Sequence, residues 1–173
     1  MPKIIQKIRE QLLQEAQKQI QTRGYAATTV RSVAEACGIG VGTVYNYFPS
    51  KDMLIATFML EDWQNALAPL KNAQTSDAKT LLNMTYDSLQ AYTQKHRALF
   101  QDKDAAKVFA AVSSEKHALL RKDIAAILAP VCAQSTLENK AFLADFLAEA
   151  VLTWGIEDKP FSDLYPLLQP LIK

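Results

Sequence analysis

The chain has 173 residues, 49% hydrophobic and 21% charged, and its formal net charge of +1 excludes a strongly polycationic protein. Its two cysteines lack CxxC spacing, so neither a zinc site nor a disulfide framework is expected. No stretch approaches the ~20 apolar residues of a membrane span, and the polar N-terminus lacks the apolar region of a signal peptide. We therefore expect a cytoplasmic protein without membrane contact.

The charge is unevenly distributed along the chain. Residues 1–52 carry seven lysines and arginines against four acids, a net charge of +3, which leaves −2 for the remainder. A mildly basic N-terminal part is compatible with a nucleic-acid partner. Helical spacing of apolar residues dominates and no useful strand-like alternation occurs, so the sequence predicts an all-α fold.

Three helices are predicted in the N-terminal part from apolar spacing and from the glycines that end them. They cover residues 3–22, a segment from Thr28 or Thr29 to Gly38, and residues 41–48. Pro49 closes the third helix, and Ser50 caps the next one.

The remainder is predicted to form four or five more helices. The helix that begins near residue 51 is expected to break at Pro69 and the NAQTSD stretch. The later segments lie near residues 76–95, 104–112, 114–132, 136–155 and 160–172. Ser135 and Glu138 match the spacing of a capping box, which predicts a firm start for the helix over 136–155.

Two short helices joined by a glycine-containing turn are typical of a helix-turn-helix, whose second helix lies in the major groove of DNA. A helical wheel of residues 41–48 places three residues on the inner face, with Tyr45 at its margin: Val41, Val44 and Phe48. It places four on the outer face: Gly42, Thr43, Asn46 and Tyr47. An asparagine can pair with adenine through two hydrogen bonds.

Lys51 is a further signal, because a cation in the first turn of a helix opposes the helix dipole and a nearby phosphate would explain it. Two other interpretations of this region stay open at this level. The helix pair can be plain packing without DNA. The GxGxG spacing could suggest a phosphate loop, but it lacks the Lys-Ser/Thr of a P-loop and follows no strand.

The stretch GYAATTVRSVAEACGIGVGTVYNYFPSKDML (residues 24–54) resembles the DNA-binding domain of the tetracycline-repressor family (TetR/AcrR-like regulators), and LLQEAQKQIQTRG before it is similar to that family's first helix. The resemblance implies an N-terminal three-helix helix-turn-helix domain over residues 1–50, and a C-terminal helical ligand-binding and dimerisation domain over residues 51–173. It also implies a DNA-contacting set: Thr29, Arg31, Gly42, Thr43, Tyr45, Asn46, Tyr47 and Lys51.

The same resemblance implies that the last two helices pair with those of a second copy. Their wide apolar stripes support this, since a helix that is apolar all round is buried on all sides. The expected interface residues are Leu143, Leu147, Val151, Trp154, Leu164 and Leu168. An effector pocket is expected between the middle helices, with seven candidate linings, although residues of these types more often belong to the ordinary core: Trp63, Met84, Tyr86, Tyr92, Phe100, Phe109 and His117.

The function predicted from the sequence is a ligand-responsive transcriptional regulator, most simply a repressor. It would bind a pseudo-palindromic double-stranded DNA operator as a homodimer and be released by a small hydrophobic effector. No cofactor, metal site or catalytic residue is expected, and Cys37 is expected to be a buried structural thiol. The alternatives are a helical protein-interaction module without sequence-specific DNA binding, and an enzyme that uses Cys or His.

Overall fold

The computed structural model describes residues 6–73, 75 and 77–173, without the side chains of residues 6 and 107–117. The regular structure of this part is helical throughout, which confirms the all-α prediction. None of its helices is both long and apolar enough to cross a membrane.

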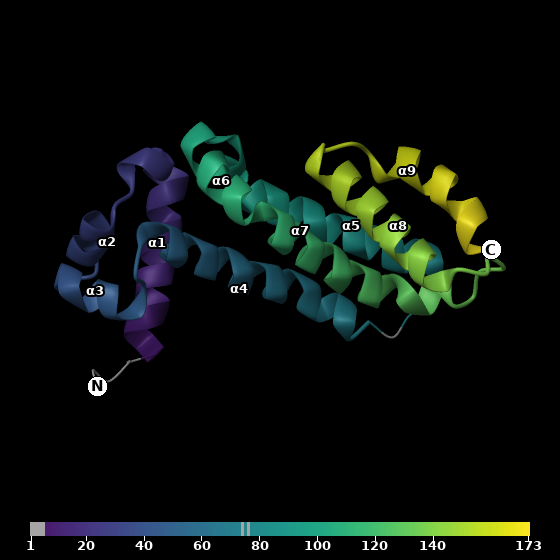
Figure 1. Ribbon diagram of the computed structural model, residues 1–173, viewed down its shortest axis with the longest axis horizontal. Coiled ribbons are helices and arrows are strands. Elements are labelled where there is room, and N and C mark those ends of the chain that lie inside the picture. Colours follow the sequence, from purple (N-terminus) through teal and green to yellow (C-terminus); the bar gives the residue numbers. More distant parts are fainter. Residues whose placement is uncertain (1–5, 74, 76) are drawn as a thin grey trace. The chain divides into compact units, whose positions relative to one another are not determined.

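The helices divide into two compact units (Figure 1). The first comprises residues 1–63 and 96–111, and the second comprises residues 64–95 and 112–173. These units are defined by packing. The division into a DNA-binding part and a ligand-binding part after residue 50 is a functional one, and it stays a prediction.

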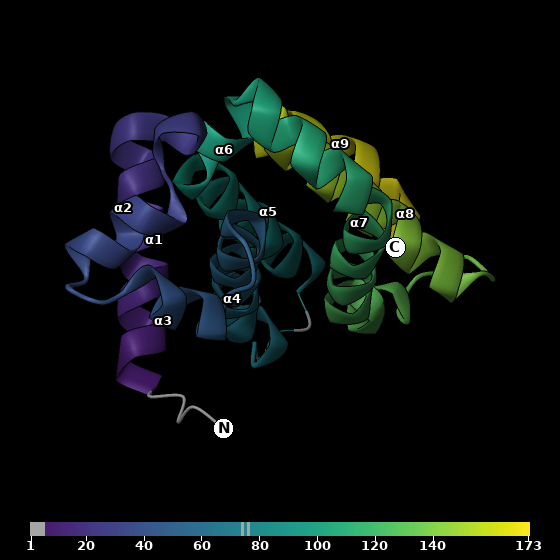
Figure 2. The same cartoon turned by 60° about the vertical axis from the view of Figure 1, so that its left-hand side comes forward.

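The first unit contains α1 (Gln6–Ala27), α2 (Val30–Ala36), α3 (Val41–Tyr47), the first part of α4 (Lys51–Lys71) and the short α6 (Arg97–Gln101). Helix α2 packs on α1 and on α3, and α6 also packs on α1 (Figures 1 and 2).

The helices of this unit begin and end close to the predicted residues. Gly24 interrupts the regular geometry of α1 with a φ of 80°, a left-handed conformation that favours glycine. Thr29 caps α2, and the Ser50 hydroxyl accepts a hydrogen bond from the Met53 N–H at 3.1 Å.

The core of the first unit is formed by apolar side chains from every one of its helices. The fully buried members, with no exposed surface, are Leu12, Ala16, Val33, Ala34, Val44, Ile55 and Ala105. Burying a Val or Leu side chain contributes about 1.5–3 kcal/mol relative to leaving it exposed. This core holds α2 and α3 against α1.

The second unit contains α5 (Ala78–Lys95), most of α7 (Lys103–Cys132), α8 (Lys140–Ile156), α9 (Phe161–Leu168) and a closing 3-10 helix, η1 (Gln169–Ile172). Helix α5 packs along α8, and α9 lies against both of them (Figure 1). The connection from α8 to α9 is fixed from both sides. The Trp154 Nε1–H donates to the Pro160 carbonyl at 2.9 Å, and the Tyr86 hydroxyl donates to the Lys159 carbonyl.

The later helices differ from the sequence-based expectations at three points. The two helices expected over 104–112 and 114–132 form the single helix α7, because the serines at their junction are weak helix formers but do not break a helix. The short α6 was not predicted. Pro69 does not end α4, which continues to Lys71 and ends where the NAQTSD stretch begins.

The start of α8 is also later than predicted. The helix begins at Lys140, and Asn139 is its cap, with Oδ1 accepting from the Phe142 N–H at 3.0 Å. The Ser135 hydroxyl, expected in a capping box, instead donates to the Leu171 carbonyl at 2.7 Å. The same oxygen accepts from the Leu137 N–H at 3.1 Å, one residue before the Glu138 N–H that a capping box would use.

Candidate DNA-binding site

Helix α3 presents a polar outer face. Its inner face is formed by Val44, which is fully buried, together with Phe48 just beyond the helix, as the helical wheel predicts. Gly42 and Asn46 are exposed on the outer face, and Thr43 is half-buried. With no bulky apolar group at these three positions, the face is free for an extended partner.

The two tyrosines of α3 differ from the wheel's assignment. Tyr45 is 51% exposed, whereas Tyr47 is half-buried and packs against the core beside Phe48, with ring centroids 6.4 Å apart. Tyr45, which the wheel placed at the buried margin, is therefore the freer of the two.

Helix α2 offers two exposed candidates at its beginning, Thr29 and Arg31. Thr29 forms a reciprocal capping box with Ser32. The Thr29 Oγ1 accepts from the Ser32 N–H, and the Ser32 Oγ accepts from the Thr29 N–H, both at 3.0 Å. This pair of bonds fixes the first turn of α2 and with it the origin of the Arg31 side chain.

Lys51, at the start of α4, has an intramolecular partner that the sequence did not reveal. Its Nζ donates to the Tyr25 carbonyl at 2.9 Å and lies 3.6 Å from the centroid of the Tyr25 ring. Burial lowers the pKa of the Lys51 ammonium, and the nearby Asp52 and Asp102 oppose that shift. The fold alone thus gives Lys51 a reason to be there, and its contact with phosphate stays a prediction.

Tyr25 connects this cation to the acid beside it. The Tyr25 hydroxyl donates to Asp52 Oδ1 at 2.6 Å, and the ring is buried. Burial and the bond to Asp52 raise the pKa of the Tyr25 phenol. The end of α1 and the start of α4 are joined by this group of three side chains.

Cys37, beside the turn of the helix pair, is half-buried. Its Sγ lies 3.8 Å from the Gln11 carbonyl oxygen, and burial together with the charge of Glu15 raises the pKa of the thiol. A raised pKa keeps the sulfur protonated and weakly nucleophilic at neutral pH. The residue thus fits a structural thiol, less buried than expected.

The candidates for an effector pocket are distributed over both units. Trp63 and Phe100 belong to the first, where Trp63 is buried and Phe100 is 49% exposed. Met84, Tyr86 and Tyr92 belong to the second, and Tyr86 is used in packing on Phe161 and in its bond to the α8–α9 connection. The side chains of Phe109 and His117 lie outside the described residues. That these residues line a cavity stays a prediction.

The residues expected at a dimer interface lie mostly inside the subunit. Five of the six, all except the half-buried Trp154, are at most 4% exposed: Leu143, Leu147, Val151, Leu164 and Leu168. This corrects the choice of residues, because a side chain buried in its own subunit cannot form the outer surface of an interface. The stripe on α8 is wide because one side serves the subunit's core and the other faces outward.

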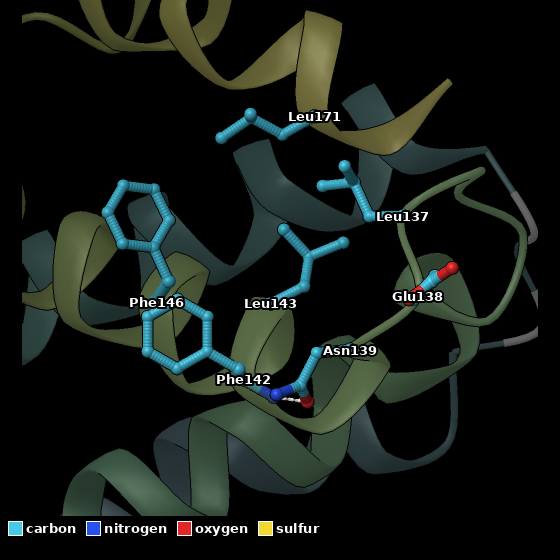
Figure 3. Close-up of a pocket in the computed structure, with 7 residues that line it drawn as sticks. All are labelled: Leu137, Glu138, Asn139, Phe142, Leu143, Phe146 and Leu171. Carbon is cyan, nitrogen blue, oxygen red and sulfur yellow. Dashed lines mark hydrogen bonds between the residues drawn. The ribbon is translucent and has the colours of Figure 1, made fainter.

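The outward side of α8 is aromatic. Phe142 is 66% exposed and Phe146 is 46% exposed. They border a shallow apolar hollow of about 330 Å³ that Leu143, Leu137 and Leu171 complete (Figure 3). The spacing of apolar residues in the sequence predicted a wide apolar stripe on this helix. Only the packing of the folded unit shows which residues of the stripe remain accessible.

Residues 12–57 match the family model described as "Bacterial regulatory proteins, tetR family". This segment contains the whole of α2 and α3 and all eight residues of the candidate DNA-contacting set. This N-terminal segment is similar to the bacterial regulatory proteins of the tetR family.

Curated HTH-type transcriptional regulators resemble this chain over part of its length. The chain is 30% identical over 102 residues to the HTH-type transcriptional repressor KstR2 of Mycolicibacterium smegmatis, a match that covers 57% of this chain and 50% of that protein. It is 26% identical over 89 residues to the HTH-type transcriptional regulator UidR of Escherichia coli, covering 48% and 45%. The matches thus span about half the length of these relatives.

Solved structures extend the similarity of fold to nearly the whole chain. Salmonella enterica GusR aligns over 99% of both chains with a TM-score of 0.65 at 18% identity. The fatty acid degradation regulator FadR from Bacillus halodurans aligns over 99% of this chain and 97% of its own, with a TM-score of 0.59 at 18% identity. At these identities the likeness concerns the fold alone.

Proposed function

We propose that this chain is a DNA-binding transcriptional regulator of the TetR family, acting as a repressor. The observation that carries the proposal is the outer face of α3. It presents Asn46 and Tyr45 to solvent, while Val44 anchors the helix from behind, and helix α2, which packs on α3, exposes Arg31. The helix pair thus exposes hydrogen-bonding groups that can read base edges and a cation that can hold phosphate.

The regulator binds its operator as a homodimer in this proposal. Exposed aromatic side chains on α8, with Leu167 of α9 at 65% exposure, provide an apolar surface that a second copy would bury. Two copies place two recognition helices about one DNA turn apart, roughly 34–36 Å, so the operator is a pseudo-palindrome.

A small hydrophobic effector releases the regulator from DNA. The middle helices carry several aromatic side chains and few charges on their apolar faces, which suits an uncharged ligand better than a sugar phosphate. Its binding favours a conformation whose helix spacing no longer fits the operator, which is a shift between two populations.

The test is a binding titration of the DNA upstream of the protein's own gene with the full chain. Fluorescence anisotropy measures the binding at several salt concentrations. Unrelated DNA of equal length serves as the competitor, and the variant Arg31→Ala/Asn46→Ala as the protein control. We expect preferential binding by the wild type that the double variant loses. Equal binding of both DNAs would favour the interaction-module alternative. A thermal-shift panel of apolar compounds and sugar phosphates then tests the effector class.

A further inference from the structure

Gln19 of α1 is a polar side chain buried in the first unit. It is 1% exposed and is surrounded in sequence and space by the apolar residues of α1, among them Ala16 and Ile20. A buried amide without partners would cost free energy, so the arrangement of its hydrogen bonds shows what it holds in place.

The side-chain amide of Gln19 forms two hydrogen bonds with one residue of α2, Ser32. Its Nε2 donates to the Ser32 carbonyl at 3.1 Å, and its Oε1 accepts from the Ser32 hydroxyl at 2.6 Å. A carbonyl can only accept, so this pair of contacts fixes which end of the amide faces which group. The second N–H of the amide donates to Glu15 Oε1 at 2.8 Å, so the group is satisfied.

The hydrogen-bond network of Gln19 continues to the residues that face DNA in the proposed function. Ser32 is the partner of Thr29 in the capping box, with both bonds at 3.0 Å. Gln19, Ser32 and Thr29 therefore form one continuous chain of hydrogen bonds from the core to the first turn of α2. Arg31 extends into solvent from that same turn.

Stability alone does not require this network. Replacing a satisfied buried polar pair by apolar groups of similar shape is often neutral or even stabilising. Directed hydrogen bonds fix the rotation of α2 about its axis more tightly than apolar packing does, because they form in only one orientation.

We propose that Gln19 is a positioning residue for DNA binding, which acts through Ser32 to orient the first turn of α2 and its Arg31. The proposal rests on the proposed function.

The test compares Gln19→Met, Ser32→Ala and the double variant with wild type, by operator binding across a salt series and by thermal unfolding of the free proteins. Methionine keeps the length of the side chain and tolerates an apolar core. The control is Gln17→Met on the same helix, whose amide donates instead to Asp62 of α4 at 2.9 Å.

We expect Gln19→Met to weaken operator binding about tenfold, as for residues coupled in one network. The melting temperature should stay near that of wild type, because Ser32 is half-buried and water can satisfy the groups that lose their partner. The slope of log K against log salt should fall by about 0.9 for each phosphate that the variant no longer neutralises, a change that a purely structural role would not produce. Ser32→Ala should have the same effect, and the double variant should add nothing. Gln17→Met should bind like wild type.

The outcomes separate the two proposals. A wild-type chain that binds no operator would overturn the proposed function, whatever Gln19 does. Wild-type binding with unchanged affinity and slope in Gln19→Met would overturn the positioning role. If Gln19→Met melts early, the decision rests on Ser32→Ala at its half-buried site: weakened binding with an unchanged melting temperature supports the role, and unchanged binding overturns it.

Discussion

Asn46 carries the most specific chemistry of the outer face of α3, because its exposed amide can donate and accept at one base edge. We expect Asn46→Ala to relax base preference at one position in each half-site by about 1–3 kcal/mol. The variant should fold like the wild type, because the Asn46 side chain faces solvent. Binding to operators changed at single positions, measured at several salt concentrations, checks this. An unchanged preference would remove Asn46 from the groove.

Lys51 has two roles to separate, one in the fold and one toward phosphate. Lys51→Gln loses the charged donor to the Tyr25 carbonyl and the interaction with the ring, so we expect a loss of about 1–2 kcal/mol in unfolding free energy. If Lys51 also holds phosphate, the salt slope should fall by about 0.9 for each phosphate it neutralises, and all DNA sequences should bind more weakly to similar degrees. Melts of the free protein and a salt titration of binding distinguish these effects. A steep, unchanged slope would assign Lys51 to the fold alone.

Tyr25 predicts a dependence on alkaline pH. Burial raises the pKa of its phenol above that in the unfolded chain, so its stabilisation is fully present below about pH 10 and is lost as the pH rises further. Wild type should therefore lose up to about 1.4 kcal/mol of unfolding free energy per pH unit more than Tyr25→Phe does. Denaturant unfolding from pH 9 to 12 measures it, with Tyr45→Phe at an exposed position as the control. Parallel curves for wild type and Tyr25→Phe would contradict the assignment.

For single residues, the sequence predicted the buried face of α3 better than it predicted the contacts that each side chain makes. The inner position of Val44 follows from helical spacing and is confirmed. The exchange between Tyr45 at the margin of the wheel and Tyr47 on its outer face was not predicted, because the neighbouring core decides which ring it accepts. The partner of Lys51 lies 26 residues away in sequence, beyond any local pattern.

The helices themselves were predictable where local signals agree. Glycines, prolines and a threonine cap mark α1, α2 and α3, and the structure follows them within a few residues. In the second half, Ser135 satisfied a local pattern, but its hydroxyl bonds to Leu171. The cap of α8 is Asn139 instead, and the bond from Ser135 to Leu171 could not be predicted because the sequence pattern carries no information about distant partners.

The true cap of α8 gives a direct test of this conclusion. Asn139→Ala removes the acceptor of the Phe142 N–H and should cost about 0.5–2 kcal/mol of stability. Glu138→Gln, at the position that the capping-box pattern favoured, is exposed and should change stability by less than about 0.5 kcal/mol. Thermal unfolding of both variants measures the difference. A larger loss in Glu138→Gln would restore the earlier helix start.

For the whole molecule, the sequence indicated that the last helices carry more apolar surface than one subunit needs. It did not indicate which residues remain for a partner. Leu147 and Phe146 are neighbours with similar hydrophobicity, yet Leu147 is fully buried and Phe146 is 46% exposed. That difference depends on where α5 and α9 pack against α8, which is information that only the assembled unit contains.

Assembly can therefore be tested at an exposed site without damaging the core. Phe142→Arg places a charge on the outward face of α8, where the native ring is 66% exposed, so the subunit should fold normally while self-association and operator binding are lost. Leu60→Arg on α4, at 46% exposure, is the matched control and should leave both intact. Light scattering at micromolar concentration, with melts of each variant, measures the outcome. A monomeric wild type, or a Phe142→Arg variant that still forms dimers, would contradict the role of this face, because a second copy could not then be what covers its exposed aromatic rings.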